Sequence, residues 1–226
     1  MNRLYRIAAL GAALALASTV LVGCRNEKDI SEKLSIISES CEKTVTQESG
    51  EILIYKTLKV DTDIEGVAEN SSEETYIKYA NNTGDPDFTI NRTSTVNASE
   101  QSSSYEFVKE GDILIELYDG VGNFAQTAPD IFEGIRLDFD VSDIESIEVT
   151  SLSKGVKEYN ILMTDEYADT FDSESDGTVI DCTKVVYCYY IDSMLELSNI
   201  LRETTSTLTH NGESQTMVEF IDAKID

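Results

Sequence analysis

The feature that most restricts the fold of this chain is a change in apolar periodicity after Val45. Before that point, apolar residues recur in steps of three and four from Ile30 to Val45, which is the spacing of one buried stripe on an amphipathic helix. After it, segments rich in strand-forming residues alternate with short turns. The pattern predicts one N-terminal helix over 29–45 followed by about ten antiparallel strands.

Three turns that contain glycine define hairpins. They are Glu110-Gly111 between 104–109 and 113–118, Lys154-Gly155 between 144–152 and 156–163, and Asn211-Gly212 between 195–209 and 216–225. The Asn-Gly pair supplies the positive φ angles of a type I′ turn. Short helical inserts are expected after Pro129, carrying Ile131, Phe132 and Ile135, and within 164–171. The sequence predicts an α+β fold, a strongly curved antiparallel sheet forming an open half-barrel around the helix.

The first 24 residues have the organisation of an export signal. Arg3 and Arg6 precede an apolar run over 7–22 that leads directly into polar chain. The run ends in Leu21, Val22, Gly23 and Cys24, which resemble the lipobox of bacterial lipoproteins. The resemblance implies cleavage before Cys24 and acylation of its thiol, which would anchor the protein to the cell membrane on its extracytoplasmic face. An uncleaved or weakly anchoring helix is the alternative.

The order of elements resembles lipoproteins built on the LolA/LolB-like half-barrel. It consists of a lipobox, a helix, consecutive strands ending in Tyr189-Tyr190-Ile191-Asp192, a long polar strand, Asn211-Gly212 and a terminal strand. The resemblance implies an open sheet closed on one side by helices, and several members hold an acyl chain or a lipid in its concave face. The export signal and lipobox predict a signal peptide over 1–23 and a lipidated tether over 24–28, and the half-barrel resemblance implies a single domain over 29–226. No catalytic or ligand signature comes with it.

Charge and composition exclude several functions. The net charge of −26 repels phosphate polymers, so nucleic-acid binding is excluded. Solubility outside the cell explains the acidity, and attraction of cations or of a basic partner is the alternative. Only one histidine is present, His210, beside a predicted turn, and there is no G-x-S-x-G motif. The chain is therefore expected to be no enzyme and to need no cofactor.

The three cysteines after Cys24 are Cys41, Cys182 and Cys188, without C-x-x-C spacing. Cys182 and Cys188 lie in one predicted strand, which would separate them by about 20 Å and prevent a bond between them. Buried free thiols are the favoured interpretation. A bridge between Cys41 and Cys182 stays open.

The best metal motif places Asp172, Glu174 and Asp176 at alternate positions before Gly177. This is the start of a calcium loop, but Thr183 occupies the position that should hold a bidentate Glu. An acidic, solvated turn is the preferred reading, with calcium as the alternative.

The segment from Val185 to Ile191 is apolar on both faces, as in a central strand covered on both sides. The functional alternative is that Val185, Tyr187, Tyr189 and Ile191 line a concave cavity. The leading hypothesis is a non-enzymatic, lipid-anchored extracytoplasmic protein that binds a hydrophobic or amphipathic, lipid-like ligand there. The alternative is an acidic envelope scaffold or adhesion protein with a filled core, able to bind calcium. No particular protein partner is indicated.

Overall fold

The computed structural model describes residues 26–61, 70–82, 86–96 and 101–226. One long helix, α2, Glu27–Val45, precedes twelve strands that form one antiparallel sheet. The strands are β1 Gly50–Val60, β2 Ser71–Ala80, β3 Asp87–Val96, β4 Gln101–Glu110, β5 Ile113–Tyr118, β6 Val121–Phe124, β7 Ile144–Ser151, β8 Lys157–Met163, β9 Ser173–Ser175, β10 Thr178–Ile191, β11 Leu197–His210 and β12 Glu213–Ile225. Short helices are α3, Asp165–Ala168, and η1, η2 and η3 at Val141–Asp143, Ser153–Gly155 and Asp169–Phe171.

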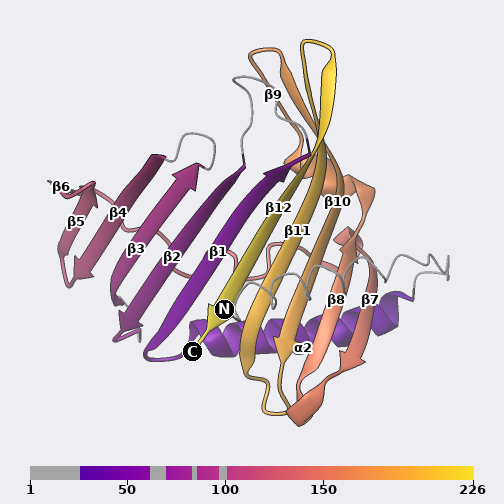
Figure 1. Ribbon diagram of the computed structural model, residues 1–226. Helices are drawn as coiled ribbons and strands as arrows, with labels where there is room; N and C mark the ends of the chain where they lie inside the picture. The colour runs from indigo at the N-terminus through magenta and orange to yellow at the C-terminus, as the bar shows by residue number, and fades with distance from the viewer. Residues whose placement is uncertain (1–25, 62–69, 83–85, 97–100) are drawn as a thin grey trace.

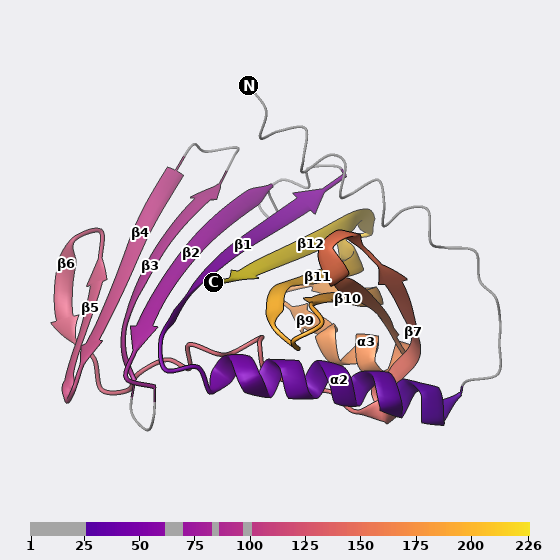
Figure 2. The ribbon, with the colours of Figure 1, turned by 90° about the horizontal axis from the view of Figure 1, so that it is seen from below.

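The sheet is open and curved. Its strands follow the order β6-β5-β4-β3-β2-β1-β12-β11-β10-β8-β7, with β9 paired to β10 beside this path. The N-terminal strand β1 therefore pairs with the C-terminal strand β12 in the middle of the sheet (Figure 1). Figure 2 shows α2 lying across the concave side. The predicted curved antiparallel sheet that holds a helix is confirmed.

The apolar stripe of α2 explains its position. Ile30, Ile37 and Cys41 are buried against the sheet, whereas acidic residues begin the helix and Lys43 lies in its last turn. These charges complement the helix dipole. Lys33 also donates a hydrogen bond to the carbonyl oxygen of Ile147 on β7, at 2.8 Å. The helix is therefore fixed to the sheet by both apolar and polar contacts.

The core lies between α2 and the concave face. A chain segment without regular structure, over 131–139, completes it with the buried side chains Ile131, Phe132, Ile135 and Phe139. The ring of Phe132 packs edge-on against Tyr79 of β2, with 5.1 Å between centroids. Ile131, Phe132 and Ile135 were expected on a short helix, but they lie in a sequence of turns. The apolar side chains are buried as the pattern required, and this is achieved without helical hydrogen bonding.

Several other predictions differ from the structure. The sheet has twelve strands instead of about ten, because the four-residue β6 and three-residue β9 were too short to give a periodic signal. The fold is mostly β, since among the described residues α2 is the only long helix.

The helical turn within 164–171 is confirmed as α3 and η3. The signal motif Leu21, Val22, Gly23 and the lipidation site Cys24 lie outside the described residues.

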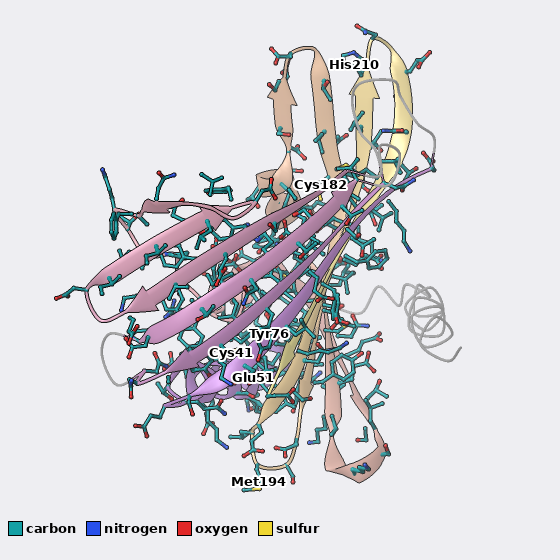
Figure 3. The ribbon with its side chains drawn as sticks, turned by 60° about the vertical axis from the view of Figure 1, so that its left-hand side comes forward. Cys41, Glu51, Tyr76, Cys182, Met194 and His210 are labelled. Carbon is teal, nitrogen blue, oxygen red and sulfur yellow. The ribbon has the colours of Figure 1, made fainter. Side chains whose placement is uncertain are left out.

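The three described cysteines, Cys41, Cys182 and Cys188, are free and buried. Figure 3 shows Cys41, which lies on α2, well apart from Cys182, which lies on β10. The interpretation as buried thiols is confirmed, and these two residues form no bridge. In the part of the chain that the structure describes, no helix has the length and apolar character needed to cross a membrane.

Candidate functional site

The four residues expected to line a cavity belong to the core. Val185, Tyr187, Tyr189 and Ile191 face α2 from β10, with exposed fractions of 0, 6, 2 and 1%. Tyr187 stacks on Tyr189. Its ring also contacts that of Phe139 in the 131–139 segment, with 5.1 Å between the centroids of Tyr187 and Phe139. The opposite face of β10 is buried too, at Val186 and Cys188. This strand is therefore covered on both sides, and the chain's own side chains pack against the proposed wall.

Tyrosine hydroxyls form a small network at the edge of this core. The Tyr167 hydroxyl of α3 lies 3.0 Å from that of Tyr187 and donates to Asp138 at 3.4 Å. Burial raises the pKa of both Tyr167 and Tyr187. Both hydroxyls therefore keep their protons at neutral pH and act as hydrogen-bonding groups that fix the position of α3.

A row of charged side chains crosses the concave face next to the apolar core. We call it the charged row; it has one residue from each of five neighbouring strands, Arg92, Glu73, Lys56, Glu219 and Arg202. These residues share the face of Ile52, Ile77 and Ile200, because side chains alternate along a strand without register shifts here. Their charges alternate across the sheet, beginning and ending with arginine.

Glu219 is the most strongly paired member of the charged row. Its carboxylate oxygens lie 2.6 Å from Lys56 Nζ and 2.6 Å from Arg202 Nη2. Burial favours the neutral acid, but the two cations outweigh it and hold the pKa of Glu219 below its usual range. Burial also opposes the charge of Arg202, yet Glu219 and the Tyr187 hydroxyl raise its pKa. Both groups are therefore ionised at neutral pH.

The other half of the charged row is paired more loosely. Arg92 Nε lies 3.4 Å from a Glu73 oxygen and donates to Thr75 Oγ1 at 3.2 Å. Glu73 also accepts a hydrogen bond from Ser94 Oγ at 2.9 Å. The side chain of Arg92 is 44% exposed, against 25% for Arg202. The row is therefore more open to solvent at Arg92, and at Lys56 in its middle, than at Arg202.

Aromatic rings support both arginines. The Arg92 guanidinium lies over the Tyr105 ring at 5.5 Å, and that of Arg202 lies over Phe171 at 5.4 Å. Stacking on the face of a ring is favourable for a cation and restricts the guanidinium to one orientation. Each arginine thus has a defined orientation on the concave face.

Two buried polar atoms beside the row have no hydrogen-bond partner among the described residues. They are Nε of Arg202 and Oγ1 of Thr204, both on β11. Thr204 is only 7% exposed. An unsatisfied buried donor costs free energy, so a polar atom supplied from outside the chain would be favoured there.

A second apolar zone follows the charged row on the same face. Leu58 and Val60 of β1, Val96 of β3 and Met217 of β12 are half-buried. The concave face therefore has three parts: the packed core, the charged row and this zone. A molecule with a polar and an apolar end would match the last two parts.

Two hollows of the surface adjoin strands of the charged row. One of about 310 Å³ is lined by Tyr55, Glu74 and Thr93 together with Lys56 and Glu73 of the row, and one of about 150 Å³ by Asn91 and Glu106 together with Arg92. Alternation places the side chains of Tyr55, Glu74, Thr93, Asn91 and Glu106 on the convex face. Both hollows are lined mainly by polar residues and do not correspond to the expected apolar cavity.

The acidic loop forms a hairpin. Asp172 accepts a hydrogen bond from the backbone N–H of Cys182 at 2.7 Å, and Glu174 lies in β9 opposite Val179 of β10. Asp176 and Gly177 make the turn with φ of 50° and 76°. Within the described part of the chain, no three acidic, histidine or cysteine side chains are grouped to hold a metal ion. The extended backbone keeps the carboxylates apart, unlike a loop that wraps around calcium.

Sequence reasoning missed the charged row because its members are far apart in the chain. An aromatic residue next to an arginine in the sequence would have been a signal for Arg92 or Arg202. The rings that they contact, Tyr105 and Phe171, belong to other elements and are distant in the sequence.

His210 was expected on a solvated turn. It ends β11, and its Nδ1 lies 2.9 Å from the Thr178 hydroxyl.

Comparison with known proteins identifies no family for this chain. No family model matches it, and neither does any curated protein. Among solved structures, it is similar to the crystal structure of LprF from Mycobacterium bovis, with 8% sequence identity and a TM-score of 0.40. The similarity covers 86% of this chain and 91% of that one.

Proposed function

We propose that this protein binds an amphipathic, anionic, lipid-like ligand on the concave face, with its head group on the charged row. One observation carries the proposal. Three cations and two carboxylates give the charged row one excess positive charge in an otherwise acidic protein. Beside that charge, Arg202 Nε and Thr204 Oγ1 lack partners within the described structure.

The ligand's apolar part would cover the second apolar zone around Leu58 and Met217. Burial of apolar surface contributes about 25 cal/mol per Å², so a chain that covers 200 Å² gains roughly 5 kcal/mol. The head group would add charge-assisted hydrogen bonds to guanidinium groups already oriented by aromatic rings. This location differs from the wall expected on β10, since the packed core occupies that wall.

The remaining parts of the proposal rest on the sequence. The lipobox-like Leu21, Val22, Gly23 and Cys24 support acylation and an extracytoplasmic location on the cell membrane. The single histidine, which lies at a hairpin, supports a non-enzymatic role. Labelling with palmitate tests the anchor. Cys24→Ser should prevent acylation, so labelled palmitate should be incorporated only into the chain that keeps Cys24. Equal palmitate incorporation into both proteins would show that the site is wrong.

Binding is tested with residues 25–226, which contain the whole described core and lack the acylated cysteine. The probes are lysophosphatidylglycerol, which is anionic, and lysophosphatidylcholine, which has the same tail and no net charge. Arg202→Gln should weaken binding of the anionic probe by about tenfold, the equivalent of one charge-assisted hydrogen bond.

Arg136→Gln is the matched control. Arg136 also pairs with a carboxylate, that of Asp130, and lies over the Phe132 ring at 5.5 Å, but it is outside the charged row. Its substitution should leave binding of both probes unchanged. Equal affinity for the two probes, or equal losses in the two variants, would contradict the assignment of the head-group site.

The second candidate function is an envelope scaffold or adhesion protein. The observation that favours it is the packing of Val185, Tyr187, Tyr189 and Ile191 by the chain's own side chains. Native mass spectrometry of residues 25–226, purified without detergent from a bacterial host, separates the two functions. A lipid-sized mass that leaves on denaturation favours ligand binding. A bare polypeptide mass, together with no binding of either probe, favours the scaffold.

A further inference from the structure

The two edges of the sheet differ in how they are protected. The β7 edge carries Glu145 and Glu148, and its register shifts between Ile144 and Ser146. One of its carbonyls, that of Ile147, accepts the hydrogen bond from Lys33. Charged residues and irregular pairing are the usual means by which proteins prevent strand addition at an edge. The β7 edge is therefore blocked.

The β6 edge has none of these features. Its four residues, Val121 to Phe124, are all exposed, and none is charged or proline. No described strand pairs with its outer side. Exposed large apolar side chains gather on this hairpin: Ile113 is 53% exposed, Tyr118 55%, Val121 70% and Phe124 84%. An open apolar strand edge of this kind is a template for an additional strand.

The two faces of the edge are both apolar. Val121 is the cross-strand partner of Tyr118 on the concave face, and Phe124 is the partner of Ile115 on the convex face. An added strand with alternating apolar residues would therefore contact apolar groups on either face.

The backbone of β6 is fixed and has outward donors. The N–H of Ala125 donates to the Leu114 carbonyl at 3.1 Å. Since hydrogen-bonded pairs alternate in an antiparallel ladder, the N–H groups of Gly122 and Phe124 point away from β5. At the turn, Asp119 accepts a hydrogen bond from the backbone N–H of Ser104 at 2.7 Å and donates its own N–H to the Ser104 carbonyl at 3.0 Å. These bonds tie the hairpin to β4.

Charge determines what kind of strand fits. Between Glu110 and Phe124 the chain has four acidic residues and no Lys or Arg; the acids are Glu110, Asp112, Glu116 and Asp119. A second copy would bring the same acidic residues against them. A segment with basic residues would instead find complementary charge.

We propose that the β6 edge binds an extended, basic segment of a partner protein, which adds to the sheet as a further strand. Main-chain hydrogen bonds to Gly122 and Phe124 hold the segment, and its lysines or arginines lie near the acidic residues of the β5–β6 hairpin. The inference is independent of the ligand proposed for the charged row.

The test uses the mature protein in a non-ionic detergent and two fluorescent peptides, Lys-Val-Lys-Val-Thr-Val-Lys and the same peptide with Glu for Lys. Gly122→Pro removes one outward N–H. Gly122→Ala is the control, because it keeps the N–H and its added Cβ meets Leu117 at an ordinary 3.5 Å. The two variants have the same net charge. Nonspecific electrostatic attraction of the basic peptide is therefore equal for both, and does not contribute to the difference between their affinities.

The lysine peptide should bind the unmodified protein and Gly122→Ala alike, and bind Gly122→Pro about tenfold more weakly, as expected for the loss of a main-chain hydrogen bond with added steric hindrance. The glutamate peptide should not bind. If Gly122→Pro fails to fold, Phe124→Lys replaces it, because this substitution places a positive charge on the edge without changing the backbone. It should weaken binding of the lysine peptide to a similar extent.

Three results would overturn the proposal. The first is failure of the lysine peptide to bind the unmodified protein. The second is equal affinity for Gly122→Pro and Gly122→Ala, provided that both fold, or for Phe124→Lys and the unmodified protein. The third is a concentration-dependent dimer in sedimentation that Gly122→Pro or Phe124→Lys abolishes, since the edge would then bind a second copy.

Discussion

Replacement of Glu219 by Gln removes the central negative charge of the charged row while keeping the size of the side chain. Glu219 lies 2.6 Å from both Lys56 and Arg202, and its side chain is 20% exposed. Exposed ion pairs contribute about 0.2–1 kcal/mol, whereas breaking a buried pair costs about 3–5 kcal/mol. A half-buried carboxylate with two partners falls between these limits. We expect Glu219→Gln to lower the free energy of unfolding by about 2 kcal/mol at pH 7.

The difference between the two proteins should depend on pH in a defined direction. The folded-state pKa of Glu219 lies below its usual value, because Lys56 and Arg202 outweigh the effect of burial. Such a group stabilises the fold above its unfolded pKa, about 4.3 for Glu, and loses this effect as the pH falls through the folded value. The difference in free energy of unfolding between the protein with Glu219 and Glu219→Gln should therefore be full above about pH 5 and should decrease at lower pH.

Thermal unfolding of residues 25–226, followed by circular dichroism between pH 3 and pH 8, measures this effect. For a chain of this size, 2 kcal/mol corresponds to a fall in Tm of about 4–8 °C. Glu51→Gln is the control, because Glu51 pairs with Lys78 at 3.1 Å on the convex surface and lies beside Tyr76 (Figure 3). Its effect should be clearly smaller. An unchanged Tm in Glu219→Gln at pH 7, or a difference that persists undiminished to pH 3, would refute the reasoning.

Three further predictions concern the core and the turns. Burial raises the pKa of Cys41 and of Cys188 to about 12, so both thiols should resist a thiol reagent at pH 8 until the protein is unfolded; rapid labelling of either in the folded protein would contradict their packing. Ile37→Ala empties a fully buried site between α2 and the sheet, and urea unfolding should show a loss of about 2–5 kcal/mol, against little change for the exposed Ser35→Ala. Asn211→Ala puts a less suitable residue at φ 50° in the β11–β12 turn and should cost roughly 1 kcal/mol by the same assay, whereas an unchanged midpoint would show that the turn does not need asparagine.

The sequence predicted those parts of the fold that depend on local signals. The apolar stripe from Ile30 to Val45 identified α2, and Asn211-Gly212 identified the β11–β12 turn, whose φ angles of 50° and 82° are those of the expected type. The segment after Pro129 was predicted as a short helix because Thr127-Ala128-Pro129-Asp130 resembles a helix start. It forms turns, because burial of Ile131, Phe132 and Ile135 requires only that they face the core.

The charged row was beyond the reach of local signals. Lys56 and Glu219 come from opposite ends of the chain and meet only because β1 pairs with β12, with Leu58 opposite Glu219 and Lys56 opposite Ile221. In the sequence each is one of many charged residues. A register shift of one residue would move either side chain to the convex face. Their pairing is therefore a property of the sheet, and no motif could reveal it.

The position of the row follows from how much of the sheet the helix covers. Along β1, the same face carries Ile52 and Ile54 in or against the core, then Lys56, then Leu58 and Val60. An uninterrupted apolar face would extend beyond the residues that α2 and the 131–139 segment cover. The paired charges instead separate the core from the second apolar zone around Leu58 and Val60. Ion pairing explains the two carboxylates and the cations beside them. It leaves Nε of Arg202 buried and without a hydrogen-bond partner among the described residues, although Nη2 of the same side chain pairs with Glu219. Under the proposed function, this Nε is the donor that Arg202 offers to an anionic head group.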